Sequence, residues 1–209
     1  MSAYRLVGRS SSHYTRVARV FAEELGVDFE FAPMFDLASR DADVYAGNPA
    51  LKLPILVTPD GPLFGTENIC RELAAAAPAR RVLWTESLPD LRARNAQELV
   101  WHAMAAQVQL VVGAQLAGLP TDNVFFGKAM LGYANALQWL DANVDAVLDS
   151  LPPHDLALLE VTLFCLLEHL AFRPTLPAPP GPRLLAFADR FRERPAARRT
   201  TFAFDVPPG

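Results

Sequence analysis

Cysteine and lysine are both scarce in this sequence, which contains only Cys70, Cys165, Lys52 and Lys128 of these two residue types. Both cysteines lie in apolar stretches with helical spacing, so we expect two buried, reduced thiols and no disulfide. A disulfide-stabilised secreted domain is therefore not the class of protein that we expect. The excess of arginine over lysine reflects genome composition and carries no functional information.

The sequence also lacks segments that would direct the chain elsewhere. No charged region followed by an apolar stretch begins it, so no export signal is expected. The most apolar run, LALLEVTLFCLL, contains Glu160 and is shorter than the ~18 residues of a membrane span, which predicts a buried helix. The net charge of −4 is too weakly acidic to indicate a nucleic acid or an anionic membrane surface as partner. We therefore predict a cytoplasmic protein with no membrane and no nucleic-acid partner.

Several catalytic motifs are missing as well. His102, His154 and His169 do not have the spacing of zinc ligands. The chain has no glycine-rich phosphate loop and no Gly-x-Ser-x-Gly elbow. No metal site is predicted.

What the chain does have is a globular composition, with 209 residues of which 51% are hydrophobic and 20% charged. Strand and helix signals alternate at first, and from Pro89 onward the strand signals end and long helices with apolar stripes follow. We predict an α/β domain over residues 1–78, a linker over residues 79–88 and an all-helical domain over residues 89–209.

The order of elements in the first domain predicts a small mixed sheet. YRLVG and VDFEFAPM flank a helix that Gly26 ends, so these two strands should be parallel. LPILVT and PLF flank the turn sequence PDG and should form an antiparallel hairpin. TENICRELAAAA then forms a helix, with Thr66 expected as its N-cap.

One stretch carries a more specific signal. NPALKLPILVTPDGPLFGTENI, residues 48–69, resembles the glutathione transferase pattern Asn-Pro-x-Gly-Lys-Val-Pro-x-Leu, which precedes a hairpin and an acid-Ser pair at a helix start. CLLEHLAFRP and FRERPAARRT are similar to the central and closing helices of bacterial cytosolic members. The resemblance implies a thioredoxin-like α/β N-terminal domain, an all-α C-terminal helical bundle, a homodimer, and glutathione as co-substrate without a metal.

The same resemblance places Ser12 at the family's catalytic serine, in the sequence GRSSSHYTRVARVFAEELG. A free thiol has a pKa of about 8.5, so little thiolate exists at neutral pH. The Ser12 hydroxyl and the helix N-terminus would stabilise the thiolate of glutathione. Ser11 and Tyr14 are alternative donors, and His13 would either tune the thiolate or lie in solvent. The turn has no cysteine, which excludes cysteine redox catalysis there. The competing interpretation is that these serines only cap the helix.

Other positions carry over from the family as glutathione contacts. Pro54 would follow a cis bond, so that Leu53 offers its N–H and C=O to the cysteinyl part of glutathione. Thr66 and the helix N-terminus would bind the γ-glutamyl carboxylate. Lys52 would meet the glycyl carboxylate or lie at the surface. Gly65 departs from the pattern, because relatives have Glu, Gln or Asp there.

The second substrate, a small hydrophobic electrophile, would lie against the first long helix, where Met104 and Gln107 are candidate contacts.

Three functions remain open at this point. A glutathione transferase is the leading interpretation. A non-catalytic protein of the same fold, acting in protein interaction or regulation, is the alternative that Gly65 suggests. A glutathione-dependent isomerase is a third, but its Ser-Ser-Cys signature is missing.

Overall fold

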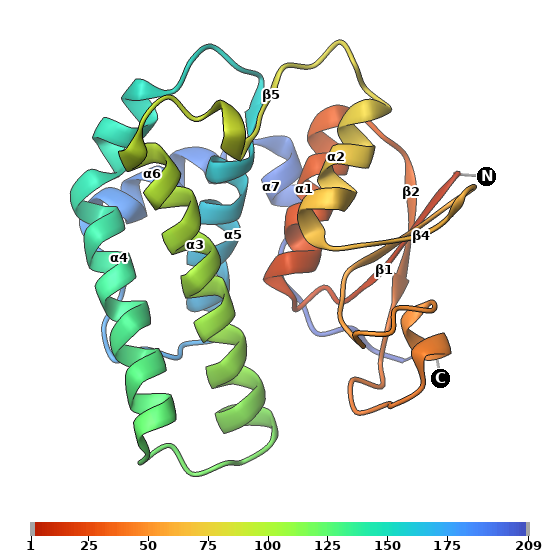
Figure 1. The fold of residues 1–209 in the computed structure, drawn as a ribbon, viewed down its shortest axis with the longest axis horizontal. Coiled ribbons are helices and arrows are strands. Elements are labelled where there is room, and N and C mark those ends of the chain that lie inside the picture. Colours follow the sequence, from red (N-terminus) through yellow and green to blue (C-terminus); the bar gives the residue numbers. More distant parts are fainter. Residues whose placement is uncertain (1–2, 208–209) are drawn as a thin grey trace. The chain divides into compact units, whose positions relative to one another are not determined.

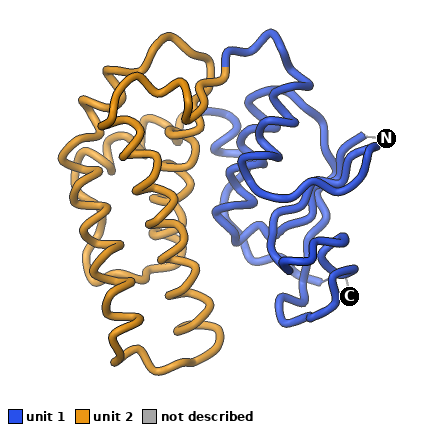
Figure 2. The backbone as a smooth tube through the Cα atoms, in the orientation of Figure 1, with its two compact units in different colours: residues 1–81, 194–209 blue, residues 82–193 orange. Residues whose placement is uncertain are grey.

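The computed structural model describes residues 3–207 and divides the chain into two compact units (Figure 1 and Figure 2). The first unit combines residues 1–81 with residues 194–209, and the second spans residues 82–193. The predicted boundaries differ from this division, because the last helical segment was expected in the helical domain and belongs instead to the first unit. The predicted linker also contains regular structure, in a two-residue strand and a short 3-10 helix.

The first unit has a four-stranded sheet in the order β2-β1-β3-β4. β1 and β2 are parallel, whereas β3 is antiparallel to β1 and to β4, which confirms the predicted parallel unit and hairpin. Its elements are β1 (Tyr4–Gly8), α1 (His13–Leu25), β2 (Phe29–Pro33), the 3-10 helix η1 (Ala42–Tyr45), β3 (Ile55–Thr58), β4 (Gly61–Phe64), α2 (Thr66–Ala75) and α7 (Pro195–Arg199).

Two layers of side chains cover this sheet. α1 and α2 pack side by side (Figure 1), and the apolar spacing of α1 buries Val17, Val20 and Phe21 completely. Met34 and Tyr45, from the segment that had no clear sequence signal, join Val7 and Ile55 in a second apolar cluster. Apolar side chains from both clusters therefore pack against the sheet.

The second unit is the predicted helical bundle. Its elements are β5 (Val82–Leu83), the 3-10 helix η2 (Thr85–Ser87), α3 (Leu91–Gln109), the π-helical extension η3 (Leu110–Leu116), α4 (Val124–Ser150), β6 (Leu156–Ala157), α5 (Leu158–Phe172) and α6 (Pro182–Arg192). The nearly all-apolar α5 is almost wholly buried, as predicted for the central helix. Cys70 of the first unit and Cys165 of α5 are buried and form no disulfide, which confirms the prediction for both thiols.

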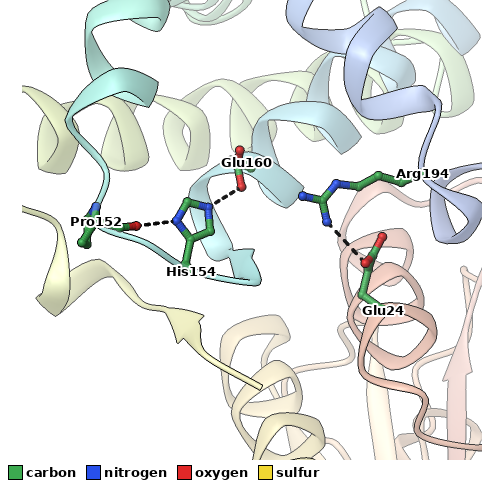
Figure 3. A network of polar contacts seen from close by, with 5 residues as sticks. All are labelled: Glu24, Pro152, His154, Glu160 and Arg194. Atoms are coloured by element: carbon green, nitrogen blue, oxygen red, sulfur yellow. Dashed lines mark hydrogen bonds and ion pairs between the residues drawn. The ribbon is translucent and has the colours of Figure 1, made fainter. Parts of the chain in front are cut away.

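α5 begins without a side-chain cap. Its N-cap is Ala157, and Glu160, three residues on, contacts His154 with 2.9 Å between Oε2 and Nε2 (Figure 3). Nδ1 of His154 lies 2.7 Å from the carbonyl oxygen of Pro152. The histidine thus joins the preceding loop to the first turn of the helix, so the acid that would close a capping box serves a different contact.

α6 is capped by a residue from another helix. Its N-cap is Gly181, and Asp141 of α4 accepts a hydrogen bond from the N–H of Leu184 at 2.9 Å. A Cβ at Gly181 would overlap the carboxyl group of Asp141. Because Gly181 has no side chain, the carboxylate of Asp141 can approach closely enough to accept a hydrogen bond from a backbone N–H in the first turn of α6.

α3 with its extension, residues 91–116, is long and apolar enough to cross a membrane by length and composition alone. A single such helix is weak evidence, because the core helix of a soluble protein passes the same test. Here it packs against α4 and α5, and Gln97 donates a hydrogen bond to Thr162 Oγ1 at 3.1 Å inside the bundle. The expected absence of a membrane partner stays a prediction.

Candidate functional site

The strand register of the first unit brings three separate segments to one end of the sheet. Val7 lies opposite Ile55, and Ile55 lies opposite Phe64. The turn after β1, the loop before β3 and the turn after β4 therefore leave the sheet at the same end. These segments contain Ser12, Pro54 and Gly65, so most of the predicted site residues come together.

The β1–α1 turn presents the hydroxyl of Ser12 at the start of a helix. Ser12 is the N-cap of α1, with φ −101° and ψ 126°, and its Oγ accepts a hydrogen bond from Thr15 N–H at 3.3 Å. Its own N–H donates to the carbonyl of Arg9 at 3.1 Å. Because capping uses the oxygen as an acceptor, the hydroxyl hydrogen remains able to donate to an anion. The capping and the catalytic interpretations of Ser12 are thus compatible.

The neighbours of Ser12 are more buried than the sequence suggested. Ser11 is buried, and His13, for which a solvated position was one alternative, is only 1% exposed. The ring of His13 meets the ring of Tyr14 edge-on, with 4.6 Å between centroids. Burial raises the pKa of Tyr14 to about 12, so its hydroxyl keeps its proton at neutral pH. The solvated alternative for His13 is therefore wrong, and its effect on a thiolate stays a prediction.

The loop before β3 contains the expected cis bond, between Leu53 and Pro54. The buried side chain of Asn48 shapes this loop, donating to the carbonyl of Lys52 at 2.9 Å and accepting from Ala50 N–H at 3.0 Å. Lys52 itself is exposed, and Pro54 is buried. The geometry leaves the backbone of Leu53 outside the sheet ladder, which begins at Ile55.

The start of α2 differs from the prediction by one residue. Gly65, not Thr66, is the N-cap, with φ 88°, and Thr66 is the first helical residue. The first backbone bond of the helix runs from Ile69 N–H to the carbonyl of Gly65 at 3.0 Å, which leaves the preceding N–H groups of the first turn without an intrahelical acceptor. A glycine suits this positive φ, because any side chain would be strained there.

Glu67 does not replace the acid that Gly65 lacks. Its Oε1 accepts from Arg71 Nη2 at 2.7 Å along the same helix. Thr66 is 8% exposed. Its hydroxyl and the N-terminus of α2 remain the candidate groups for holding an anion at the start of this helix, because helix N-termini favour negative charge.

These features agree with the comparisons with known proteins. Residues 6–81 match the sequence model described as "Glutathione S-transferase, N-terminal domain". The chain has the glutathione S-transferase fold. No curated protein matches its sequence.

Three solved structures illustrate the likeness to the glutathione S-transferase fold. A glutathione S-transferase from Methylobacillus flagellatus with glutathione bound has 21% identity, covers 96% of this chain and 100% of its own, and gives a TM-score of 0.74. A glutathione S-transferase from Methylobacterium radiotolerans, in complex with glutathione sulfonate, has 21% identity and a TM-score of 0.72; the match covers 99% of this chain and 98% of that one. A glutathione transferase family member from Pseudomonas fluorescens, with bound glutathione, has 20% identity and a TM-score of 0.71; the match covers 95% of this chain and 98% of that one.

Met104 and Gln107, the predicted electrophile contacts, lie inside the second unit. Both are 0% exposed. Neither polar atom of the Gln107 amide has a hydrogen-bond partner in the described part of the chain. A ligand could touch them only if the bundle opened, so their role as substrate contacts stays a prediction without support from this geometry.

Tyr133 of α4 is a second polar side chain in the same core, and it yields a stability prediction. It is 1% exposed, and its hydroxyl has no partner among residues 3–207. Replacing Tyr133 by Phe should raise the free energy of unfolding by about 1 kcal/mol at neutral pH, because a buried, unpaired hydroxyl is costly. Urea denaturation measures this change.

The pH dependence gives a second readout of the same variant. Burial raises the pKa of Tyr133 above its ordinary value of 10.0. The unfolded state therefore loses this proton first, and stability present below pH ~10 falls as pH rises further. Tyr133→Phe should reduce that alkaline loss. Tyr4→Phe is the control, because the Tyr4 hydroxyl donates to Glu72 at 3.0 Å and its removal should lower stability at neutral pH; equal effects of the two variants would contradict the prediction.

Sequence reasoning missed one group of residues beside the site. Asp205 accepts a hydrogen bond from the N–H of Ser10 at 2.8 Å, and Arg16 of α1 is 1% exposed beneath the C-terminal segment. No local pattern connects residues this far apart in the chain, so the sequence offered no signal for the contact. Among residues 3–207, no group of three or more His, Cys, Asp or Glu side chains is placed to hold a metal ion.

Proposed function

We propose that this protein is a glutathione transferase that joins glutathione to a small hydrophobic electrophile. The observation that carries the proposal is the meeting of three features at one end of the sheet: the Ser12 hydroxyl at the start of α1, the cis Leu53–Pro54 loop, and the start of α2, where no side chain caps the helix. Each matches one part of a thiol tripeptide, namely its sulfur, its central backbone and its γ-glutamyl carboxylate.

Binding would use mainly backbone groups. The N–H groups at the start of α2 and the Thr66 hydroxyl would hold the γ-glutamyl carboxylate, because the helix dipole and the unpaired donors both favour an anion. Leu53 would offer its N–H and C=O to the cysteinyl residue, and the exposed Lys52 would meet the glycyl carboxylate. Since Gly65 adds no side chain, the site would depend on these groups alone.

Catalysis would consist of stabilising the sulfur anion. The Ser12 hydroxyl would donate a hydrogen bond to the thiolate, and the positive end of α1 would add to that stabilisation. Each unit by which the thiol pKa falls corresponds to about 1.4 kcal/mol. The thiolate then forms a carbon–sulfur bond with the electrophile, which either expels its leaving group or takes up a proton from solvent.

The comparisons with known proteins support the proposal. Glutathione or its sulfonate is bound in three solved proteins of similar fold. The family match covers residues 6–81, which contain every part of the proposed glutathione site.

Calorimetric titration with glutathione tests the binding step, and thermal unfolding with glutathione provides a second readout. Ligand at 100 times its dissociation constant should stabilise the fold by about 2.7 kcal/mol. Conjugation to a halogenated nitrobenzene, followed by absorbance, tests turnover. Absence of heat and of thermal stabilisation at millimolar glutathione would reject the proposal.

A non-catalytic role in protein interaction or regulation is the second candidate, and Gly65 is the observation that favours it. With no acid or amide side chain at this position, the start of α2 has fewer contacts to offer a ligand. A stable protein partner recovered with the chain, together with no glutathione-dependent turnover, would favour this function over the first.

We also propose that the protein acts in the cytoplasm as a homodimer. Large apolar side chains are exposed on α4, where Val124, Phe125 and Leu131 are 85%, 58% and 63% exposed. A second copy would cover such a surface. Sedimentation of the wild-type chain should give twice the mass of one chain.

The variant Leu131→Arg should shift that mass toward a single chain, because it places a charge in the proposed interface. Leu185→Arg, on an exposed leucine of α6, is the matched control and should leave the mass unchanged. A monomeric wild type, or a Leu131→Arg variant that remains dimeric, would contradict the proposed interface.

A further inference from the structure

The segment that follows α7 runs back to the turn that carries Ser12. Ala203 N–H donates to the carbonyl of Ser10 at 3.4 Å, and Ser10 N–H donates to Asp205 Oδ2 at 2.8 Å. Both polar backbone atoms of Ser10 are thus bonded to residues 203–205. The turn is held from outside as well as by its own hydrogen bonds.

Ion pairs to α1 hold the chain on its way to this contact. Arg194 Nη1 lies 3.3 Å from Glu24 Oε2 (Figure 3), and Arg199 Nε lies 2.6 Å from Glu23 Oε2. All four side chains belong to the first unit. The path of residues 194–199 is therefore fixed along the C-terminal half of α1.

A buried arginine provides a second anchor nearer the turn. Arg16 donates from Nη2 to the carbonyl of Ala197 at 3.1 Å, and its guanidinium carbon lies 4.4 Å from the centroid of the Phe202 ring. Burial strengthens such a cation–π contact, because water does not compete for the charge. Arg16 is in the first turns of the helix that Ser12 caps, so the anchor is continuous with the candidate site.

We propose that Asp205 is a positioning residue for Ser12, an inference that rests on the proposed transferase function. Ser12 N–H bonds to the carbonyl of Arg9, so the orientation of Ser12 follows from the turn formed by residues 9–12. Asp205 fixes the middle of that turn through Ser10. Holding the hydroxyl in place matters, because small displacements of a catalytic group lower the rate steeply.

The choice of an acid at this position fits a geometric role. A hydrogen bond from a backbone N–H to a carboxylate is stronger than one to a neutral acceptor. The negative charge itself would oppose a nearby thiolate, so the benefit of Asp205 must come from holding the turn. Asp205→Asn separates the two effects, since it removes the charge and keeps an oxygen acceptor, whereas Asp205→Ala removes both.

The first experiment needs no glutathione. Amide hydrogen exchange of Ser10, measured by NMR on the full-length unliganded protein, reports the hydrogen bond to Asp205 directly. Exchange should be at least about 10-fold faster in Asp205→Ala and closer to wild type in Asp205→Asn. Asp149→Asn, on an exposed acid of α4, is the matched control and should leave it unchanged.

The second experiment measures conjugation. Asp205→Ala should lower kcat by about 10-fold with a small change in KM for glutathione, and should move the pH profile of kcat/KM to higher pH. Asp205→Asn should keep most of the wild-type kcat. A role confined to stability would lower the melting temperature without moving the pH profile.

Each outcome separates the two proposals. Unchanged Ser10 exchange in Asp205→Ala, or faster exchange with unchanged kcat and pH profile, would overturn the positioning role while leaving the transferase function intact. A wild-type protein that neither binds nor conjugates glutathione would overturn the transferase function and the positioning role that rests on it. In that case the exchange data would still show whether Asp205 holds the turn.

Discussion

Replacing Ser12 by Ala should lower the kcat for glutathione conjugation by about 100-fold, because removal of one donor to a reacting anion has an effect of this size. The affinity for glutathione should change little, since the tripeptide would be held by Leu53, Thr66 and the start of α2. The pH profile of kcat/KM should move to higher pH, because the sulfur anion loses its donor. Steady-state kinetics between pH 5 and pH 9 measures both effects.

Stability must be separated from catalysis in this variant, because Ser12 also caps α1. Ser12→Ala should cost about 1 kcal/mol of unfolding free energy. Ser12→Gly provides the matched control: glycine at an N-cap costs only a few tenths of a kcal/mol, yet it has neither a side-chain donor nor a charge that would repel a thiolate. A stable Ser12→Gly variant without activity would assign the loss to the missing donor. Wild-type turnover in Ser12→Ala, with lost turnover in Ser11→Ala, would move the donor to Ser11.

Replacing Gly8 by Ala should lower the free energy of unfolding by about 2 to 3 kcal/mol, which is the size of an overpacking effect in a rigid core. Gly8 ends β1, and a Cβ there would overlap Cγ2 of Thr15 and lie 2.7 Å from its Oγ1. Thr15 is fully buried, and its Oγ1 accepts from Arg9 N–H at 3.3 Å, so it has little freedom to move. Urea denaturation measures the loss.

A double-mutant cycle tests this cause directly. In a Thr15→Ala background the overlapping atoms are gone, so Gly8→Ala should cost little, and the coupling should approach about 2 kcal/mol. Gly132→Ala, at an exposed position in α4 with no atom near the new Cβ, should instead stabilise by about 0.5 to 1 kcal/mol. An equal cost of Gly8→Ala in both backgrounds would show that the contact with Thr15 is not responsible.

The fold was predictable wherever local pattern and packing agree. The apolar spacing of α1, the PDG hairpin and the apolar run of α5 each specify one element, and the structure contains all three. The segment before Asn48 had no periodic signal, because its short 3-10 helix is fixed by the packing of Tyr45 against the sheet. The division by contacts differs from the predicted domains for a similar reason: only long-range contacts place α7 in the first unit, and no local pattern reveals them.

The site was predictable where chemistry depends on residues adjacent in sequence. The cis bond before Pro54 was expected from the family resemblance, and helix capping was one interpretation of the serines before α1; the structure contains both the cis bond and Ser12 as N-cap. The N-cap of α2 was assigned one residue late, because Thr66 is a good capping residue while the positive φ of Gly65 is invisible in sequence. Burial of Gln107 could not be foreseen either, since a half-polar helix has several faces that could turn inward.

Residues 194–205 leave the ribosome only after all of residues 82–193 have done so. The sheet and α1 can therefore assemble early in translation, but the bonds from Ala203 and Asp205 to Ser10 must wait until the bundle has been synthesised. During this interval, the first unit of a nascent chain would lack the contacts made by residues 194–205. For the same reason, an expressed fragment of residues 1–81 would lack these contacts. An affinity tag fused after Asp205 would follow a residue that bonds to the Ser12 turn, so recombinant work should place tags before residue 1.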